Sequence, residues 1–225
     1  MRWIFLFLTL FGFVCSRAQE VFYGGFFPEF SLTKKISSKM HGTFKVESQH
    51  GLYDHQEVES WEYFHDRTDL QFFVGRSLTP LIKVDVGYQY RVDPSGGNNH
   101  RLIQQIAFIQ RLASGKIGHR IRTDQTFSED EEDVLYRIRY RLAYQKPLQG
   151  AELDPGEFYL SLSNELIYAY EAGDQEFENR LVGSLGYVFS DTIKMESGMD
   201  YRTDRFIAPG FRQRLWWKTG AYLAF

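Results

Sequence analysis

The stretch that decides the fold is Trp216-Trp217-Lys218-Thr219-Gly220-Ala221-Tyr222-Leu223-Ala224-Phe225, at the end of the chain. Every second residue counted back from Phe225 is uncharged, and the interleaved set carries the one charge, Lys218. Such alternation predicts a β-strand with two different faces. A strand with one lipid-compatible face and a terminal aromatic is typical of the closing strand of an outer-membrane β-barrel. We interpret three of these side chains as a barrel-assembly signal: Trp217, Leu223 and Phe225.

The start of the chain favours the same destination. Arg2 provides a short basic opening, and Ile4 to Val14 is apolar but too short for a spanning helix. Ser16-Arg17-Ala18 then offers small residues around a cleavage point. We expect residues 1–18 to be a cleaved signal peptide that exports the protein to the outer membrane of a Gram-negative bacterium. Residues 19–225 are then expected to form one outer-membrane barrel domain.

Composition narrows the class of protein. Without residues 1–18 the chain has 24 basic and 29 acidic residues, a net charge of −5 that argues against a nucleic-acid partner. The one cysteine, Cys15, falls in the expected signal peptide, so the remaining chain has no disulfide or thiolate. Aromatic residues make up 17% although the mean hydropathy is only −0.38. A barrel reconciles these values, because half of each strand faces lipid and half a polar interior.

Strict alternation recurs through the rest of the chain. It is clearest in 134–145, where Tyr136 and Tyr140 oppose Arg137, Arg139 and Arg141. The pattern predicts an all-β, transmembrane, antiparallel up-and-down barrel of about 10–12 strands. Our count is eleven, but single-chain bacterial barrels usually have an even number, so we expect ten or twelve. The segments expected as strands are 26–36, 40–50, 70–78, 81–92, 102–112, 117–127, 134–145, 158–168, 178–189, 193–202 and 216–225.

Connection lengths support the barrel. Short turns alternate with longer polar stretches, as expected for periplasmic turns and external loops. The segment 148–156 is an exception, because its position predicts a turn and its length does not. The acidic run 129–133 is expected to be a solvated external loop, with a loop that binds divalent cations or bridges lipopolysaccharide as the alternative. The short turns are 37–39, 79–80, 113–115 and 190–192, and the long loops are 50–59, 93–99, 128–133, 171–176 and 203–210.

The face opposite the apolar residues is heavily charged, and we place it in the lumen. Arginine suits such a lumen because its planar fork pairs with carboxylates in two places. A filled salt-bridge network and an anion-attracting pore are both open, and small barrels usually have packed interiors. The expected lumen charge network is Asp85, Arg91, Arg120, Arg122, Asp124, Arg137, Arg139, Arg141, Glu165, Glu178, Arg180, Lys194, Glu196, Asp200 and Arg202.

No catalytic motif stands out. A hydrolase would need a histidine paired with serine or aspartate near the membrane boundary, and none of the six histidines stands in such a motif. One group around a presumed external loop could bind metal, but its spacing matches no standard site. We therefore predict no catalytic residue, metal or cofactor. The histidines are His41, His50, His55, His65, His100 and His119, and the acidic residues of that group are Asp54, Glu57, Glu59 and Asp66.

Several runs resemble an uncharacterised outer-membrane family of the Bacteroidota, domain-of-unknown-function family 2490. They are 100–105, 119–127 and 136–142 followed by Lys146-Pro147-Leu148, then Asn164-Glu165, Asn179-Arg180-Leu181 and Gly186-Tyr187. The resemblance covers about 22–225 in the same order. It departs where the family often has an aromatic at Ile103 and glutamate at Asp124. The resemblance implies a β-barrel but no reaction.

The sequence thus predicts a structural or permeability-related outer-membrane barrel with a charged, largely filled lumen. Its expected partners are outer-membrane lipids, lipopolysaccharide and the barrel-assembly machinery. The alternatives are a small anion-preferring pore, a barrel hydrolase acting on lipid or lipopolysaccharide, and a soluble lipocalin-like barrel that binds a ligand. The last would enclose Tyr136, Tyr140 and Tyr144 and leave the arginines in solvent.

Overall fold

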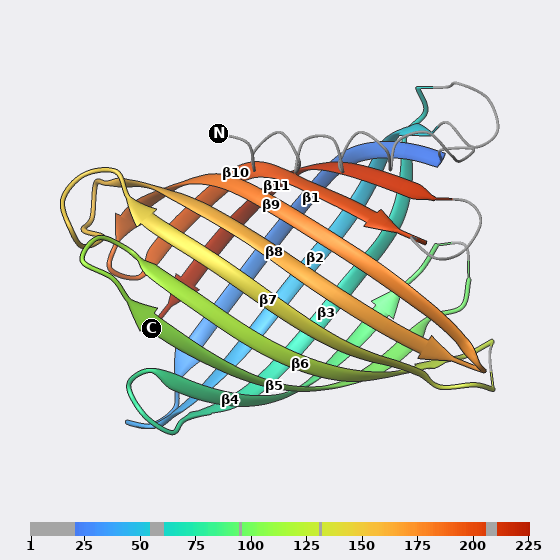
Figure 1. Cartoon of the computed structure of the whole chain (residues 1–225), viewed down its shortest axis with the longest axis horizontal. Coiled ribbons are helices and arrows are strands. Elements are labelled where there is room, and N and C mark those ends of the chain that lie inside the picture. Colours follow the sequence, from blue (N-terminus) through green and yellow to red (C-terminus); the bar gives the residue numbers. More distant parts are fainter. Residues whose placement is uncertain (1–20, 55–60, 95, 131, 206–210) are drawn as a thin grey trace, which may run out of the picture.

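The computed structural model describes residues 21–225 except 55–60, 95, 131 and 206–210, so the expected signal peptide lies outside the described residues. Among the described residues no helix is long and apolar enough to cross a membrane. The described chain forms eleven β-strands arranged as a barrel (Figure 1). They are β1 (Val21–Lys35), β2 (Met40–Asp54), β3 (Phe64–Ser77), β4 (Ile82–Val92), β5 (Asn99–Arg111), β6 (Lys116–Ser128), β7 (Leu135–Pro147), β8 (Phe158–Glu171), β9 (Asp174–Ser190), β10 (Ile193–Asp204) and β11 (Arg212–Ala224).

Each strand pairs with its neighbours in sequence, and β1 pairs with β11 to close the barrel. The all-β barrel is therefore confirmed, but the expectation of an even strand number is wrong for the described chain. With eleven alternating strands the first and last run in the same direction, so the β1–β11 pair is parallel while the others are antiparallel. The backbone of Phe225 completes this closure by hydrogen bonds with Thr33 and Lys35.

The two ends of the barrel differ in their connections. We call the end with 36–39 and 112–115 the turn end, and the end with 93–98 and 129–134 the loop end. The long loop expected at 171–176 is wrong, because β8 and β9 are joined by Ala172-Gly173 alone. Both residues have positive φ, 50° and 97°, as a two-residue hairpin turn that matches strand twist requires. At the turn end, 148–157 remains the long exception.

Apolar side chains face outward and charged side chains face inward. Tyr136 and Tyr140 on β7 are 52% and 41% exposed, whereas Arg139 between them is 5% exposed. On β4, exposed Val86 lies between buried Asp85 and the small residue Gly87. This arrangement is the reverse of the one that a lipocalin-like barrel requires.

A small cluster of buried apolar side chains lies at the closure of β1 and β11, while other buried apolar residues such as Ile103 and Tyr159 are placed singly along the wall. Tyr23, Phe27 and fully buried Trp216 pack together at the closure, with the guanidinium of Arg202 4.9 Å from the centre of the Phe27 ring. The remaining interior is filled mainly by polar and charged side chains, which need mutual partners because burial removes their water.

Candidate functional site

The centre of the interior charge network is Asp124 on β6, whose side chain is completely buried. Its Oδ1 lies 2.7 Å from a terminal nitrogen of Arg137, and its Oδ2 lies 2.8 Å from Nε of Arg139. Arg101 approaches from β5 at 3.4 Å and also donates to Thr126 and Gln89. Three guanidinium groups, one from β5 and two from β7, thus converge on one carboxylate of β6.

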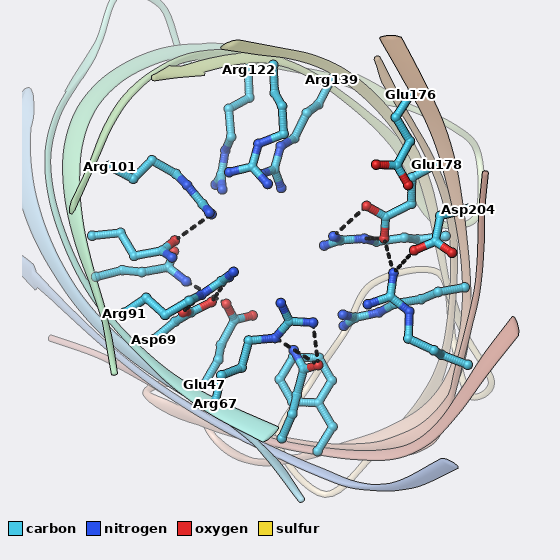
Figure 2. Close-up of a pocket in the computed structure, with 18 of the residues that line it drawn as sticks. Glu47, Arg67, Asp69, Arg91, Arg101, Arg122, Arg139, Glu176, Glu178 and Asp204 are labelled. Atoms are coloured by element: carbon cyan, nitrogen blue, oxygen red, sulfur yellow. Dashed lines mark hydrogen bonds and ion pairs between the residues drawn. The ribbon is translucent and has the colours of Figure 1, made fainter. Parts of the chain in front are cut away.

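Further ion pairs ring the loop half of the interior (Figure 2). Asp69 on β3 accepts two hydrogen bonds from Arg91 on β4, at 2.7 and 2.8 Å. Glu178 on β9 accepts two from Arg180, at 2.7 and 3.0 Å, and a third from Arg214 on β11 at 3.3 Å. Bidentate pairing fixes both the distance and the orientation of the partners. The network therefore links strands that are not neighbours in the wall.

The turn half contains a second cluster at the barrel closure. Glu29 on β1 lies 3.0 Å from the ammonium of Lys45 on β2 and 2.7 Å from that of Lys218 on β11. Arg120 on β6 donates a hydrogen bond to Glu165 on β8 at 2.7 Å, beside the middle of the interior. The two pairs of Glu29 link β11 to β1 and β2, and the pair of Arg120 with Glu165 links β6 to β8.

Three cavities follow one another between these side chains. Along β9, Glu178 lines the first, Arg180 the first and second, Val182 the second and third, and Ser184 the third. Their volumes are about 170, 70 and 190 Å³ from the loop half to the turn half. Of these three, the middle one is the smallest.

The loop-half cavity has a marked excess of positive charge. Ten arginines and five carboxylates line it among the described residues. Arg122 there donates two hydrogen bonds to the side-chain oxygen of Gln105, at 2.7 and 3.0 Å, and lies over the ring of Phe73. Among the described residues, three buried donor atoms at this cavity have no hydrogen-bond acceptor in good geometry: Nε2 of Gln89, Nε of Arg214 and Nε of Arg139, which lies 2.8 Å from Asp124. Such an arrangement attracts anions.

The structure brings most of the expected lumen residues together in pairs. Asp85 is bonded by His41 and Gln105, at 2.8 and 2.9 Å. Glu196 accepts hydrogen bonds from Tyr159 and Ser184 instead of pairing with a cation. The expected residues found in ion pairs with arginine or with a carboxylate are Arg91, Arg120, Asp124, Arg137, Arg139, Glu165, Glu178, Arg180, Asp200 and Arg202. Within the described ranges no ion pair forms at Arg122, Arg141, Lys194 or Glu196.

Sequence reasoning missed about half of the network. Asp69 and Arg101 lie on strands whose alternation is less regular, yet the set Arg67, Asp69, Gln71 does alternate with apolar residues. That short alternation would have placed Asp69 on the lumen face, whereas its position opposite Arg91 comes from the register between β3 and β4. The missed members are Glu29, Lys45, Glu47, Arg67, Asp69, Arg101, Glu176, Asp204, Arg212, Arg214 and Lys218.

The expected assembly residues lie on or beside β11. Trp217 and Phe225 are 56% and 64% exposed on the outer surface. Leu223 is half-buried and pairs with Leu32 of β1 and Ile193 of β10.

The histidines lie in different parts of the barrel. His119 bonds the hydroxyl of outward-facing Tyr140 at 2.8 Å, and His100 bonds the hydroxyl of Tyr88. His50 and His65 stack with ring centres 5.1 Å apart. In the part of the chain that the structure describes, no group of three or more potential ligands could hold a metal ion. The suggested ligands His55, Glu57 and Glu59 lie outside the described residues.

Comparison with protein families finds one whose description is "Protein of unknown function (DUF2490)", and its model matches residues 24–210. This range includes β2 to β10 and most of β1, but not β11. Comparison with curated proteins and with solved structures yields no match.

Proposed function

We propose, from the premise that the chain belongs to the DUF2490 family of proteins of unknown function, that it is an outer-membrane β-barrel whose ion-paired interior keeps the barrel closed to solutes. Its role is then structural, or it limits permeability. Export would proceed through a cleaved signal peptide, and the barrel-assembly machinery would insert the chain among outer-membrane lipids and lipopolysaccharide.

The outward-facing surface supports the membrane location. Phe72, Val86 and Leu166 are each more than half exposed, on β3, β4 and β8. Large exposed apolar surfaces are rare on soluble monomers and mark contact with lipid or with another protein. An apolar band outside and a polar lumen inside is the arrangement of transmembrane barrels.

Asp124 is the observation that carries the closed interior. A carboxylate with no exposed surface and three arginines around it needs all of these partners in place, because each unpaired buried charge is costly. The cluster ties β5, β6 and β7 together, and its Arg139 also lines the small middle cavity of about 70 Å³. Such an interior favours support of the wall over passage of large solutes.

Planar bilayers test this function. The full chain, inserted from detergent, should produce no steps in current, while Arg139→Ala with Arg122→Ala should open conducting states by removing two side chains that line both the first and the middle cavity. Asp191→Asn, an exposed turn residue, is the matched control and should remain silent. Regular conductance of the unmodified chain would contradict the closed interior.

The second candidate, an anion-preferring pore, is favoured by the arginine excess of the loop-half cavity. Current measurements in the same planar bilayers distinguish this pore from the closed barrel. A pore would conduct in the unmodified state, and under a salt gradient its reversal potential would show preference for chloride over potassium. Arg122→Glu should then reduce that preference, because it reverses the charge of a guanidinium that forms no ion pair with any described carboxylate.

A further inference from the structure

A second polar cluster lies on the outer wall of the barrel, away from the charged interior. Ser48 and His50 are two residues apart on β2 and share a face, opposite to buried Gln49 between them. Ser48 Oγ lies 2.9 Å from Nε2 of His50. This is the distance at which a histidine can take a proton from a serine hydroxyl.

The neighbouring strand β3 adds two groups to this pair through a shift in register. Gln49 pairs with Arg67 but His50 pairs with His65, so Asp66 has no partner in the ladder. The extra residue turns His65 to the same face as Thr68, and their side chains meet at 2.8 Å. Without this bulge, two residues three apart on a strand would face opposite sides of the wall.

The five side chains form one directed chain of hydrogen bonds. The N–H at Nδ1 of His50 can donate to the Tyr63 hydroxyl at 2.9 Å, which leaves Nε2 free to accept from Ser48. On the other side, Thr68 Oγ1 lies 2.8 Å from Ser48 Oγ and 2.8 Å from Nε2 of His65. Nucleophile, base and orienting group thus stand in the order that acyl transfer requires.

The surface beside the cluster is apolar on the side toward the middle of the barrel. Counting by twos from Ser48 and Thr68, the next outward residues are Val46 and Leu70, which pair with each other. The rings of Phe44 and Phe72 follow, with centres 4.8 Å apart. A molecule with an acyl chain on this apolar strip would carry its ester group to Ser48.

We infer that Ser48, His50, Tyr63, His65 and Thr68 form an esterase site for the acyl ester of an amphipathic lipid, on the outer wall near the loop end. Ser48 Oγ attacks the ester carbonyl carbon while its proton passes to Nε2 of His50. The Thr68 hydroxyl, which accepts the N–H of His65 and is free to donate its own proton, stabilises the oxyanion.

The second half of the reaction restores the site. The carbon–oxygen bond to the alcohol breaks, and the leaving alkoxide takes the proton from His50. Water then attacks the acyl-serine, gives one proton to His50 and releases the carboxylic acid as that proton returns to Ser48 Oγ. The lipid substrate rests on the proposed membrane location, whereas the catalytic group does not depend on the charged interior.

The test uses the refolded full chain in detergent micelles with p-nitrophenyl decanoate, and a fluorophosphonate that modifies activated serines. We expect ester hydrolysis and modification of Ser48, located by mass spectrometry. Ser48→Ala and His50→Asn should each lose about 100-fold or more of kcat. Thr68→Val should lower kcat with little change in KM, since the oxyanion forms only in the transition state.

The matched control is His119→Asn, because His119 is also bonded to an outward tyrosine hydroxyl but not to a serine. It should hydrolyse the ester as the unmodified chain does. Heat-dependent gel mobility checks that each variant is folded.

A second arm offers phosphatidylethanolamine–phosphatidylglycerol vesicles and measures released fatty acid. Hydrolysis there supports the lipid substrate. Hydrolysis of the micellar ester alone supports the site and overturns its lipid substrate and membrane setting. A folded chain that leaves both esters intact and Ser48 unmodified overturns the esterase, with no bearing on the bilayer result.

Discussion

Replacement of Asp124 by asparagine probes the interior network most directly. The substitution keeps the shape of the side chain and removes its charge, leaving Arg101, Arg137 and Arg139 around a neutral amide. These side chains are 5%, 11% and 6% exposed, so water in the cavity that they line replaces the lost carboxylate only in part. Removal of one member of a buried ion pair costs about 3–5 kcal/mol, and three cations that repel one another favour the upper part of that range.

The measurement is the free energy of unfolding of the full chain in phospholipid vesicles, from urea titration followed by tryptophan fluorescence. Asp191→Asn, at the exposed turn between β9 and β10, is the matched control and should stay within about 0.5 kcal/mol of the unmodified chain. Addition of Arg139→Gln to Asp124→Asn should recover part of the loss, because it removes one of the stranded charges.

A loss of less than about 1 kcal/mol for Asp124→Asn would refute this reasoning. It would mean that water or an anion reaches the three guanidinium groups as easily as the carboxylate does. The interior would then be open at the very position where we place its main closure.

Three further predictions use the same unfolding measurement. Gly186→Ala should destabilise the barrel by about 1–3 kcal/mol, because the new Cβ would stand 2.2 Å from the ring of buried Tyr159; an unchanged midpoint would show that the ring can move. Ile138→Arg on the outer wall should cost about 2–4 kcal/mol in vesicles, whereas Ile36→Arg at the turn end should cost little; equal effects would contradict the membrane location. Glu29→Gln should cost about 3–5 kcal/mol and loosen the closure, because two lysine ammonium groups lose their shared carboxylate; native-state hydrogen exchange confined to the closing strands would support this reason, and uniform exchange would contradict it.

Alternation allowed the sequence to predict the class of fold and the two faces of the wall. On β7 apolar or aromatic residues alternate with arginine from Tyr136 to Leu142, and they lie outside and inside as that pattern indicates. The local rule is sufficient here because successive side chains of a strand point to opposite faces whatever the strand pairs with.

Strand number and pairing partners could not be predicted in the same way. The expectation of an even number of strands was wrong. An odd number closes through a parallel β1–β11 pair, and this pairing depends on how the first and last strands meet in space. Likewise, Arg120 pairs with Glu165 two strands away, and no spacing in the chain reports that distance. The shear and curvature of the closed wall set which inward side chains meet.

The chain by itself therefore determined that its residues form strands, which side of each strand is apolar, and that charge gathers on the other. Tertiary structure alone decided that three arginines converge on Asp124, and that a bulge opposite Gln49 and His50 brings His65 and Thr68 beside Ser48. The physical reason is that periodicity is a property of one strand, whereas a charge cluster or a catalytic group is made by the register between strands.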